Sequence, residues 1–229
     1  MKFLIEDSNK IDLHIHTVFS DGVKQPLDII LEAKEKGLEY IAFTDHNEDE
    51  ARFEYSEAYI EQKYGVKVIA GCELDVFFKG KLVHLLAYDY VDAFNDFFLP
   101  KIQKNFGVKK LSLKKACRMI HFCLGYAVIA HPLRYGDDAK ELLNEIIKEV
   151  KIDGVECIHS SNTQEEVDYL LELCNKNDLM VTAGSDFHKK GRTVREDYKQ
   201  NNIDELPVLN STIEEQLIKA RQKYPANKR

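Results

Sequence analysis

The sequence lacks any apolar run near the roughly 20 residues that a membrane-spanning helix requires, which argues against a spanning protein. Its start, MKFLIEDSNK, has no long apolar stretch followed by small residues, so we expect no secretory signal and a cytoplasmic location.

Repeats, low-complexity tracts and an evident linker are also absent, so we expect one domain over residues 1–229. Basic residues number 32 against 39 acidic ones, and the net charge of −7 argues against stable binding to duplex nucleic acid.

Cysteines are few and have no paired spacing. There are five, an odd number, and no two are spaced C-x-x-C. A disulfide framework or a thiolate zinc site is therefore not expected. We expect all five to be small buried apolar residues in a reducing compartment: Cys72, Cys117, Cys123, Cys157 and Cys174.

Short apolar runs alternate with longer helical patterns along most of the chain. Seven runs have the near-continuous Val, Ile, Leu and Ala content of parallel strands buried on both faces: 11–16, 40–44, 66–73, 82–88, 126–130, 154–158 and 179–184. Helix-start signals lie between them, namely Pro26, Ser112 and the Thr163/Glu166 capping box, with a second box at Thr212/Glu215. This alternation predicts an α/β fold with a parallel sheet, either open or closed into a barrel.

Residues 89–112 interrupt the alternation. The segment is aromatic early and basic late, and we expect an excursion over the barrel mouth rather than a core element. Residues 101–118 hold seven basic side chains and no acidic one. They form either a solvated helix face or a lid that attracts a polyanion such as a nucleotide or short oligonucleotide.

Residue types that commonly bind metals lie at or just after the ends of most of the predicted strands. His14 and His16 have the two-residue spacing that puts both imidazoles on one side of a strand. Because the C-terminal ends of parallel strands meet at one face of an α/β barrel, such residues from different strands would converge. For Asp21, which precedes Gly22, an ordinary turn residue is the alternative. Nine residues make up the set: His14, His16, Asp21, His46, Glu73, His84, His131, Asp186 and His188.

The number and type of these residues indicate the kind of site. One ion rarely takes more than six protein ligands, so nine imply two or three ions. Mixed imidazole and carboxylate ligands favour Zn, Mn or Fe over Mg or Ca. Carboxylates can bridge such ions at the separation that suits two-metal phosphoryl chemistry.

Several strings of the sequence closely resemble the PHP (polymerase and histidinol phosphatase) family, over about residues 11–188. The strings are DLHIHT at 12–17, SDG at 20–22, TDH at 44–46, GCE at 71–73, AHP at 130–132 and GSDFH at 184–188. The resemblance implies a distorted (β/α)7 TIM-like barrel with phosphoesterase activity and a trinuclear metal site at the C-terminal ends of the strands. It implies one ion at His14, His16, Glu73 and Asp186, a second at Glu73, His84 and His131, and a third at Asp21, His46 and His188.

Other residues are candidates for supporting roles. We expect Arg134, three residues after His131, to contact a substrate phosphate, because its planar fork suits phosphate oxygens. His159 is a candidate for a hydrogen bond to substrate. The basic run after His188, which includes Lys189 and Arg192, either contacts an anion or is a solvated loop. Asp45 is expected to orient a ligand or strand end, and His121 to be structural.

Together these features predict a metal-dependent phosphoesterase. Metal-activated hydroxide would attack the phosphorus of a small phosphorylated substrate, such as a nucleotide or nucleoside bisphosphate, with Asp21, His46, Glu73 and Asp186 as the catalytic set. The alternatives are a histidinol-phosphate phosphatase, a short-oligonucleotide exonuclease, a non-catalytic binding module and an amidohydrolase-type barrel.

Overall fold

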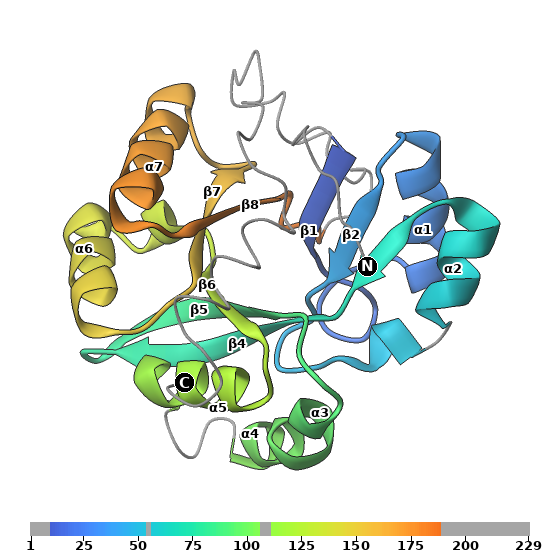
Figure 1. The fold of residues 1–229 in the computed structure, drawn as a ribbon, viewed down its shortest axis with the longest axis horizontal. Helices are drawn as coiled ribbons and strands as arrows, with labels where there is room; N and C mark the ends of the chain where they lie inside the picture. Colours follow the sequence, from blue (N-terminus) through green and yellow to red (C-terminus); the bar gives the residue numbers. More distant parts are fainter. Residues whose placement is uncertain (1–9, 54–55, 106–110, 189–229) are drawn as a thin grey trace.

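The computed structural model of the chain describes residues 10–53, 56–105 and 111–188 and has a mixed α/β fold (Figure 1). Three parallel strands form one sheet: β1 (Ile11–Ile15), β2 (Tyr40–Phe43) and β3 (Lys67–Ile69). Five strands form the other, in chain order: β4 (Gly71–Phe78), β5 (Lys81–Tyr88), β6 (Tyr126–Ile129), β7 (Gly154–His159) and β8 (Met180–Gly184). Isolated bridges from Ile15 to Phe187 and from His46 to Glu73 connect the two sheets.

Helices cover the outer faces of both sheets (Figure 1). Beside the first sheet lie α1 (Pro26–Glu35) and α2 (Glu57–Tyr64). Around the second sheet lie α3 (Ala93–Phe97), α4 (Leu99–Asn105), α5 (Leu113–Phe122), α6 (Ala139–Glu149) and α7 (Gln164–Asn177). Two 3-10 turns, Glu50–Phe53 and Pro132–Arg134, follow β2 and β6. In the described part of the chain, no helix has the length and apolar content needed to cross a membrane.

The expectation of seven parallel strands is confirmed only in part: β1–β3 and β6–β8 pair in parallel, but the region between them does not. Residues 66–73 contain two strands, β3 and β4, which belong to different sheets. Lys79 and Gly80 have φ values of 47° and 88° and turn the chain back after β4. Two-residue turns with positive φ join antiparallel strands, so β5 runs antiparallel to both β4 and β6. His84 therefore lies within an antiparallel strand and not at the end of a parallel one.

Helix starts predicted from local signals are confirmed. Pro26 is the first residue of α1, the Ser112 hydroxyl accepts a hydrogen bond from Lys115 N, and Thr163 and Glu166 form a capping box. Helix α5 ends at Phe122, and Leu124 adopts a positive φ of 64°. The second predicted capping box, at Thr212 and Glu215, lies outside the described residues.

Part of residues 89–112 packs in the core, contrary to the expectation of a segment outside it, although Phe97 is 60% exposed. Phe94 is fully buried and its ring lies 4.6 Å from that of Tyr90. Leu99 and Ile102 of α4 are also buried, because α3 and α4 turn apolar side chains toward the second sheet. On α4, Gln103 Nε2 donates to Asn47 O at 3.0 Å, so this helix contacts the loop that carries His46.

Two further expectations concern buried side chains. All five cysteines are free and buried, as predicted. His121 is buried on α5, where its Nε2 lies 2.6 Å from Asp153 Oδ2, and the same oxygen accepts a hydrogen bond from Ala127 N. This pair ties α5 to the start of β6, so the structural role expected for His121 is confirmed.

Candidate metal centre

The inner group of the site consists of His14, His16, Glu73 and Asp186. His14 and His16 point to the same side of β1, with their Nε2 atoms 3.1 Å apart. Glu73 Oε2 lies 3.3 and 3.2 Å from these two nitrogens, and Asp186 Oδ1 lies 3.4 Å from each. The Asp186 backbone N–H donates to His14 O, which fixes the end of β8 beside β1. Two nitrogens and two carboxylate oxygens thus surround one point.

The middle group consists of Glu73, His84 and His131. Glu73 Oε1 lies 3.0 Å from His84 Nδ1 and 3.1 Å from His131 Nε2, and the two nitrogens are 3.2 Å apart. Since the other oxygen of Glu73 belongs to the inner group, this one carboxylate spans both groups. His131 follows β6 with φ of 24°, a rare conformation that turns its ring toward Glu73.

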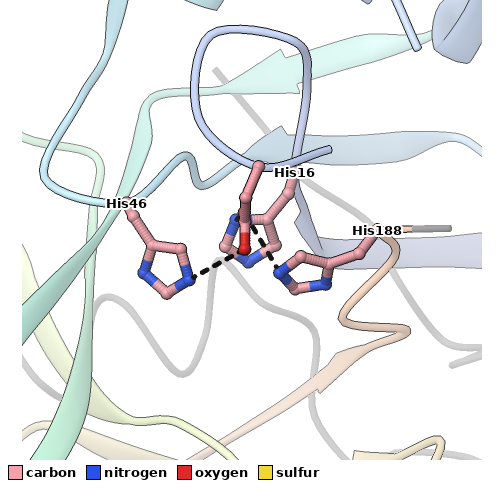
Figure 2. A group of neighbouring side chains, drawn as sticks. His16, His46 and His188 are labelled. Atoms are coloured by element: carbon pink, nitrogen blue, oxygen red, sulfur yellow. Dashed lines mark ion pairs between the residues drawn. The ribbon is translucent and has the colours of Figure 1, made fainter. Parts of the chain in front are cut away.

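The outer group consists of His16, Asp21, His46 and His188, and Figure 2 shows its three imidazoles converging. Asp21 Oδ1 lies 3.3 Å from His188 Nε2 and 3.5 Å from His16 Nδ1, and Asp21 Oδ2 lies 3.9 Å from His46 Nε2. The Asp21 side chain is 57% exposed, whereas Glu73 is buried, so the outer group faces solvent. His16 joins this group as well as the inner one, a sharing that the family resemblance does not imply.

The electrostatics of the inner and middle groups suit divalent cations. Burial opposes ionisation of Glu73, but the surrounding imidazoles outweigh it and hold its pKa well below the usual range. Burial likewise opposes protonation of His16, yet Asp186 and Glu73 raise its pKa to about 9. Glu73 Oε2 makes no hydrogen bond, although three imidazole nitrogens lie within 3.3 Å of it. Imidazole nitrogens and carboxylate oxygens that converge on one point are typical of a cation site, where metal binding displaces the protons of the histidines.

Two carboxylates around these groups, one fully buried and one partly buried, were missed by sequence reasoning. Glu156 on β7 is fully buried; its Oε1 lies 3.0 Å from His14 Nδ1, and its Oε2 accepts from His131 N at 2.8 Å. Asp75 on β4 has Oδ1 3.3 Å from His84 Nε2. Carboxylates commonly orient metal-binding histidines through the second ring nitrogen. A lone acidic residue inside the apolar run 154–158 was the signal that could have revealed Glu156.

Asp45 organises the loop that carries Asp21. Its carboxylate accepts hydrogen bonds from Thr17 N, Thr17 Oγ1 and Ser20 Oγ at 2.6–2.7 Å. It is absent from all four groups of potential ligands found among the described residues. The expectation that Asp45 orients the ligand-bearing chain is therefore confirmed.

The candidate substrate contacts have different surroundings. Arg134 forms an ion pair with Asp186 through NH1, and half of its side-chain surface is exposed. His159 is buried, with Nε2 3.4 Å from Asp186 Oδ2 and Nδ1 2.7 Å from Ser161 Oγ. This burial favours support of Asp186 over the expected contact with substrate. Lys189 and Arg192 lie outside the described residues.

The fold and the site together define a mixed α/β protein with overlapping groups of candidate metal ligands. Residues 12–222 match the family model described as PHP domain. The chain therefore belongs to the PHP family of metal-dependent phosphoesterases and is a hydrolase of phosphoric ester bonds.

Two named relatives are similar to the chain in sequence, and a solved structure is similar to it in fold. The chain is 25% identical to the 5′-3′ exoribonuclease of Haemophilus influenzae, covering 79% of this chain and 90% of the relative. It is 26% identical to a "probable phosphatase" of Caldicellulosiruptor bescii, covering 90% and 92%. A Chromobacterium violaceum amidohydrolase with bound sulfate has the same fold, with a TM-score of 0.70, 20% identity and coverage of 92% and 96%.

Proposed function

We propose that the chain hydrolyses a phosphate ester of a nucleotide or nucleoside bisphosphate. The observation that carries the proposal is the sharing of ligands between groups: Glu73 belongs to the inner and middle groups, and His16 to the inner and outer groups. Shared ligands hold neighbouring cations close together, which is the arrangement used for in-line displacement at phosphorus. When bound at such a centre, Zn, Mn or Fe ions lower the pKa of water and offset phosphate charge.

The residues of the chain would divide the remaining tasks. Glu73 fixes the separation of the inner and middle groups. Asp186 contacts the inner group through Oδ1 and pairs with the half-exposed Arg134 through Oδ2. Arg134 is placed to exchange its contact with Asp186 for a contact with a substrate phosphate. Asp21 and His46, at the solvent-facing side of the site, define where the substrate enters.

The names of relatives support a nucleotide-type substrate. One relative is an exoribonuclease, and an Eggerthella lenta relative, 32% identical over 77 residues, is a phosphoribosyl 1,2-cyclic phosphate 1,2-diphosphodiesterase. Histidinol phosphate and short oligonucleotides are the alternative substrates. A module without catalysis is disfavoured, because all nine expected ligands converge in three overlapping groups.

A phosphate-release screen tests this proposal. Protein stripped of metal and reloaded with Mn²⁺, Zn²⁺ or Fe²⁺ is assayed on nucleotides, nucleoside bisphosphates, short oligonucleotides and histidinol phosphate. We expect the highest kcat/KM for a nucleotide or nucleoside bisphosphate. Highest turnover of histidinol phosphate would refute the substrate assignment, and no turnover of any ester by the metal-loaded protein would refute the proposed reaction.

Replacing Arg134 by Ala is expected to raise KM for the best substrate of that screen about 10–150-fold, because a charge-assisted hydrogen bond contributes about 1.5–3 kcal/mol. The Arg134→Lys variant keeps the charge but loses the planar fork, and it should recover only part of the affinity. Steady-state kinetics separate the KM effect from kcat. An unchanged KM in Arg134→Ala would remove this residue from the substrate site.

A further inference from the structure

Asp75 lies between the ligands of two different groups of the candidate metal centre. In the β4–β5 hairpin, Asp75 pairs directly with His84, and Glu73 lies two residues earlier on the same face of β4. Asp75 Oδ1 is 3.3 Å from His84 Nε2 and 3.8 Å from His46 Nδ1. One oxygen thus faces a histidine of the middle group and a histidine of the outer group.

His84 faces Asp75 with a different ring nitrogen from the one that faces the other ligands, whereas the Nδ1 of His46 faces Glu73 at 3.3 Å and Asp75 at 3.8 Å. His84 turns Nδ1 toward Glu73 and His131, and its Nε2 toward Asp75. His46 turns Nε2 toward Asp21, and its Nδ1 toward Asp75 and Glu73. A neutral imidazole has one lone pair and one N–H. When the first nitrogen binds a cation, the second therefore carries a proton that points at a carboxylate.

Asp75 is itself held in place from the other side. Asn47 Nδ2 donates to Asp75 Oδ2 at 3.1 Å, and Asp75 N donates to Asn47 Oδ1 at 3.2 Å. Asn47 N also donates to Glu73 O at 2.7 Å. Asn47 is buried and has φ of 52°. These contacts fix the carboxylate of Asp75 relative to both β4 and the loop that carries His46.

We propose that Asp75 is a positioning residue that sets the ring orientation of His84 and His46 and thereby couples metal binding in the middle and outer groups. The inference rests on the proposed metal centre and adds to it a residue outside the nine expected ligands. None of the ion pairs within the inner group of the described residues includes Asp75, so we expect cation binding there to be independent of this carboxylate.

Mn²⁺ titration of the chelator-stripped, full-length protein tests the proposal, with free Mn²⁺ measured by electron paramagnetic resonance. In Asp75→Asn we expect one ion to bind with wild-type affinity and the others to bind about 10–100-fold more weakly, the usual cost of losing an orienting carboxylate. The Glu50→Gln variant, which removes an exposed negative charge from the 3-10 turn after His46, serves as the charge-matched control and should titrate as wild type. Co²⁺ absorption spectra report the altered histidine coordination independently of activity.

Three results would overturn the proposal. Wild-type affinities for every ion in Asp75→Asn would show that Asp75 does not act on the histidines. An equal loss of affinity for all ions would indicate that Asp75 has a general structural role. Loss of one whole ion with the others unchanged would make Asp75 a ligand of its own cation site with His46 and His84. Binding of fewer than two ions by the wild type would instead refute the metal centre itself.

If Asp75→Asn does not fold, a second variant tests the proposed positioning role of Asp75. Asn47→Gly removes the amide that holds Asp75 Oδ2, and glycine accepts the positive φ at this position. We expect the same pattern with a smaller loss: weaker binding in the middle and outer groups and unchanged binding of one ion. Wild-type titration of Asn47→Gly would contradict the proposed coupling in that case.

Discussion

Replacing Glu73 by Gln is expected to lower kcat/KM for phosphate release about a thousandfold. Its two oxygens contact nitrogens of His14, His16, His84 and His131 at 3.0–3.3 Å, so the change affects the inner and middle groups together. An amide keeps one carbonyl oxygen but loses the charge that lets a carboxylate bridge two cations. Loss of metal stabilisation of several kcal/mol corresponds to a rate loss of that size. Steady-state kinetics with Mn²⁺ in excess measure the effect.

A matched variant separates this effect from a general loss of charge. Glu149→Gln also converts one carboxylate to an amide, but Glu149 is exposed, pairs with Lys79, and belongs to none of the groups of potential ligands among the described residues. It should retain wild-type kinetics. Circular dichroism of both variants reports whether the fold is intact. Folded Glu73→Gln with wild-type kcat/KM would eliminate Glu73 as a bridging ligand and with it the polynuclear arrangement proposed for the site.

Removing bound metal is expected to abolish activity and to lower the melting temperature. The inner group gathers the buried carboxylate of Glu73 and the largely buried one of Asp186, which a divalent cation would compensate. An ion that binds only the folded state stabilises it by about 4 kcal/mol when its free concentration is a thousandfold above Kd. Dialysis against a strong chelator should therefore lower Tm, and added Mn²⁺ should restore both Tm and phosphate release.

Magnesium provides the control for that experiment. Six of the nine expected ligands are histidines, and Mg²⁺ prefers oxygen ligands. Equal concentrations of Mg²⁺ should restore little activity compared with Mn²⁺. Full activity of protein shown by elemental analysis to hold less than about one tenth of an ion per chain would contradict a role for metal in the reaction.

The strands show what the apolar pattern of the sequence predicts about this fold: their locations, but not their directions. Apolar runs located seven strand regions, because burial on both faces leaves a continuous apolar string. The direction of β5 was missed, since direction depends on the turn at Lys79 and Gly80 and not on the composition of the strand. His84 nevertheless lies beside Glu73, with Nδ1 3.0 Å from Oε1, because β5 pairs with β4 at this point.

Sequence by itself determined the features that depend on near neighbours. These are the helix starts at Pro26, Ser112 and Thr163, the two-residue spacing of His14 and His16, and the identity of the nine candidate ligands in chain order. Each is encoded within a few residues, where propensity, capping and strand alternation act directly.

Only the tertiary structure decided how those residues are shared and supported. Glu156 meets His14 across 142 positions of sequence, and Asp75 meets His84 only through the register of the β4–β5 hairpin. His16 contacts two groups because β1 lies between the ends of β8 and the loop after β2. Such contacts depend on which strands become neighbours, and the composition of a strand does not specify its neighbour.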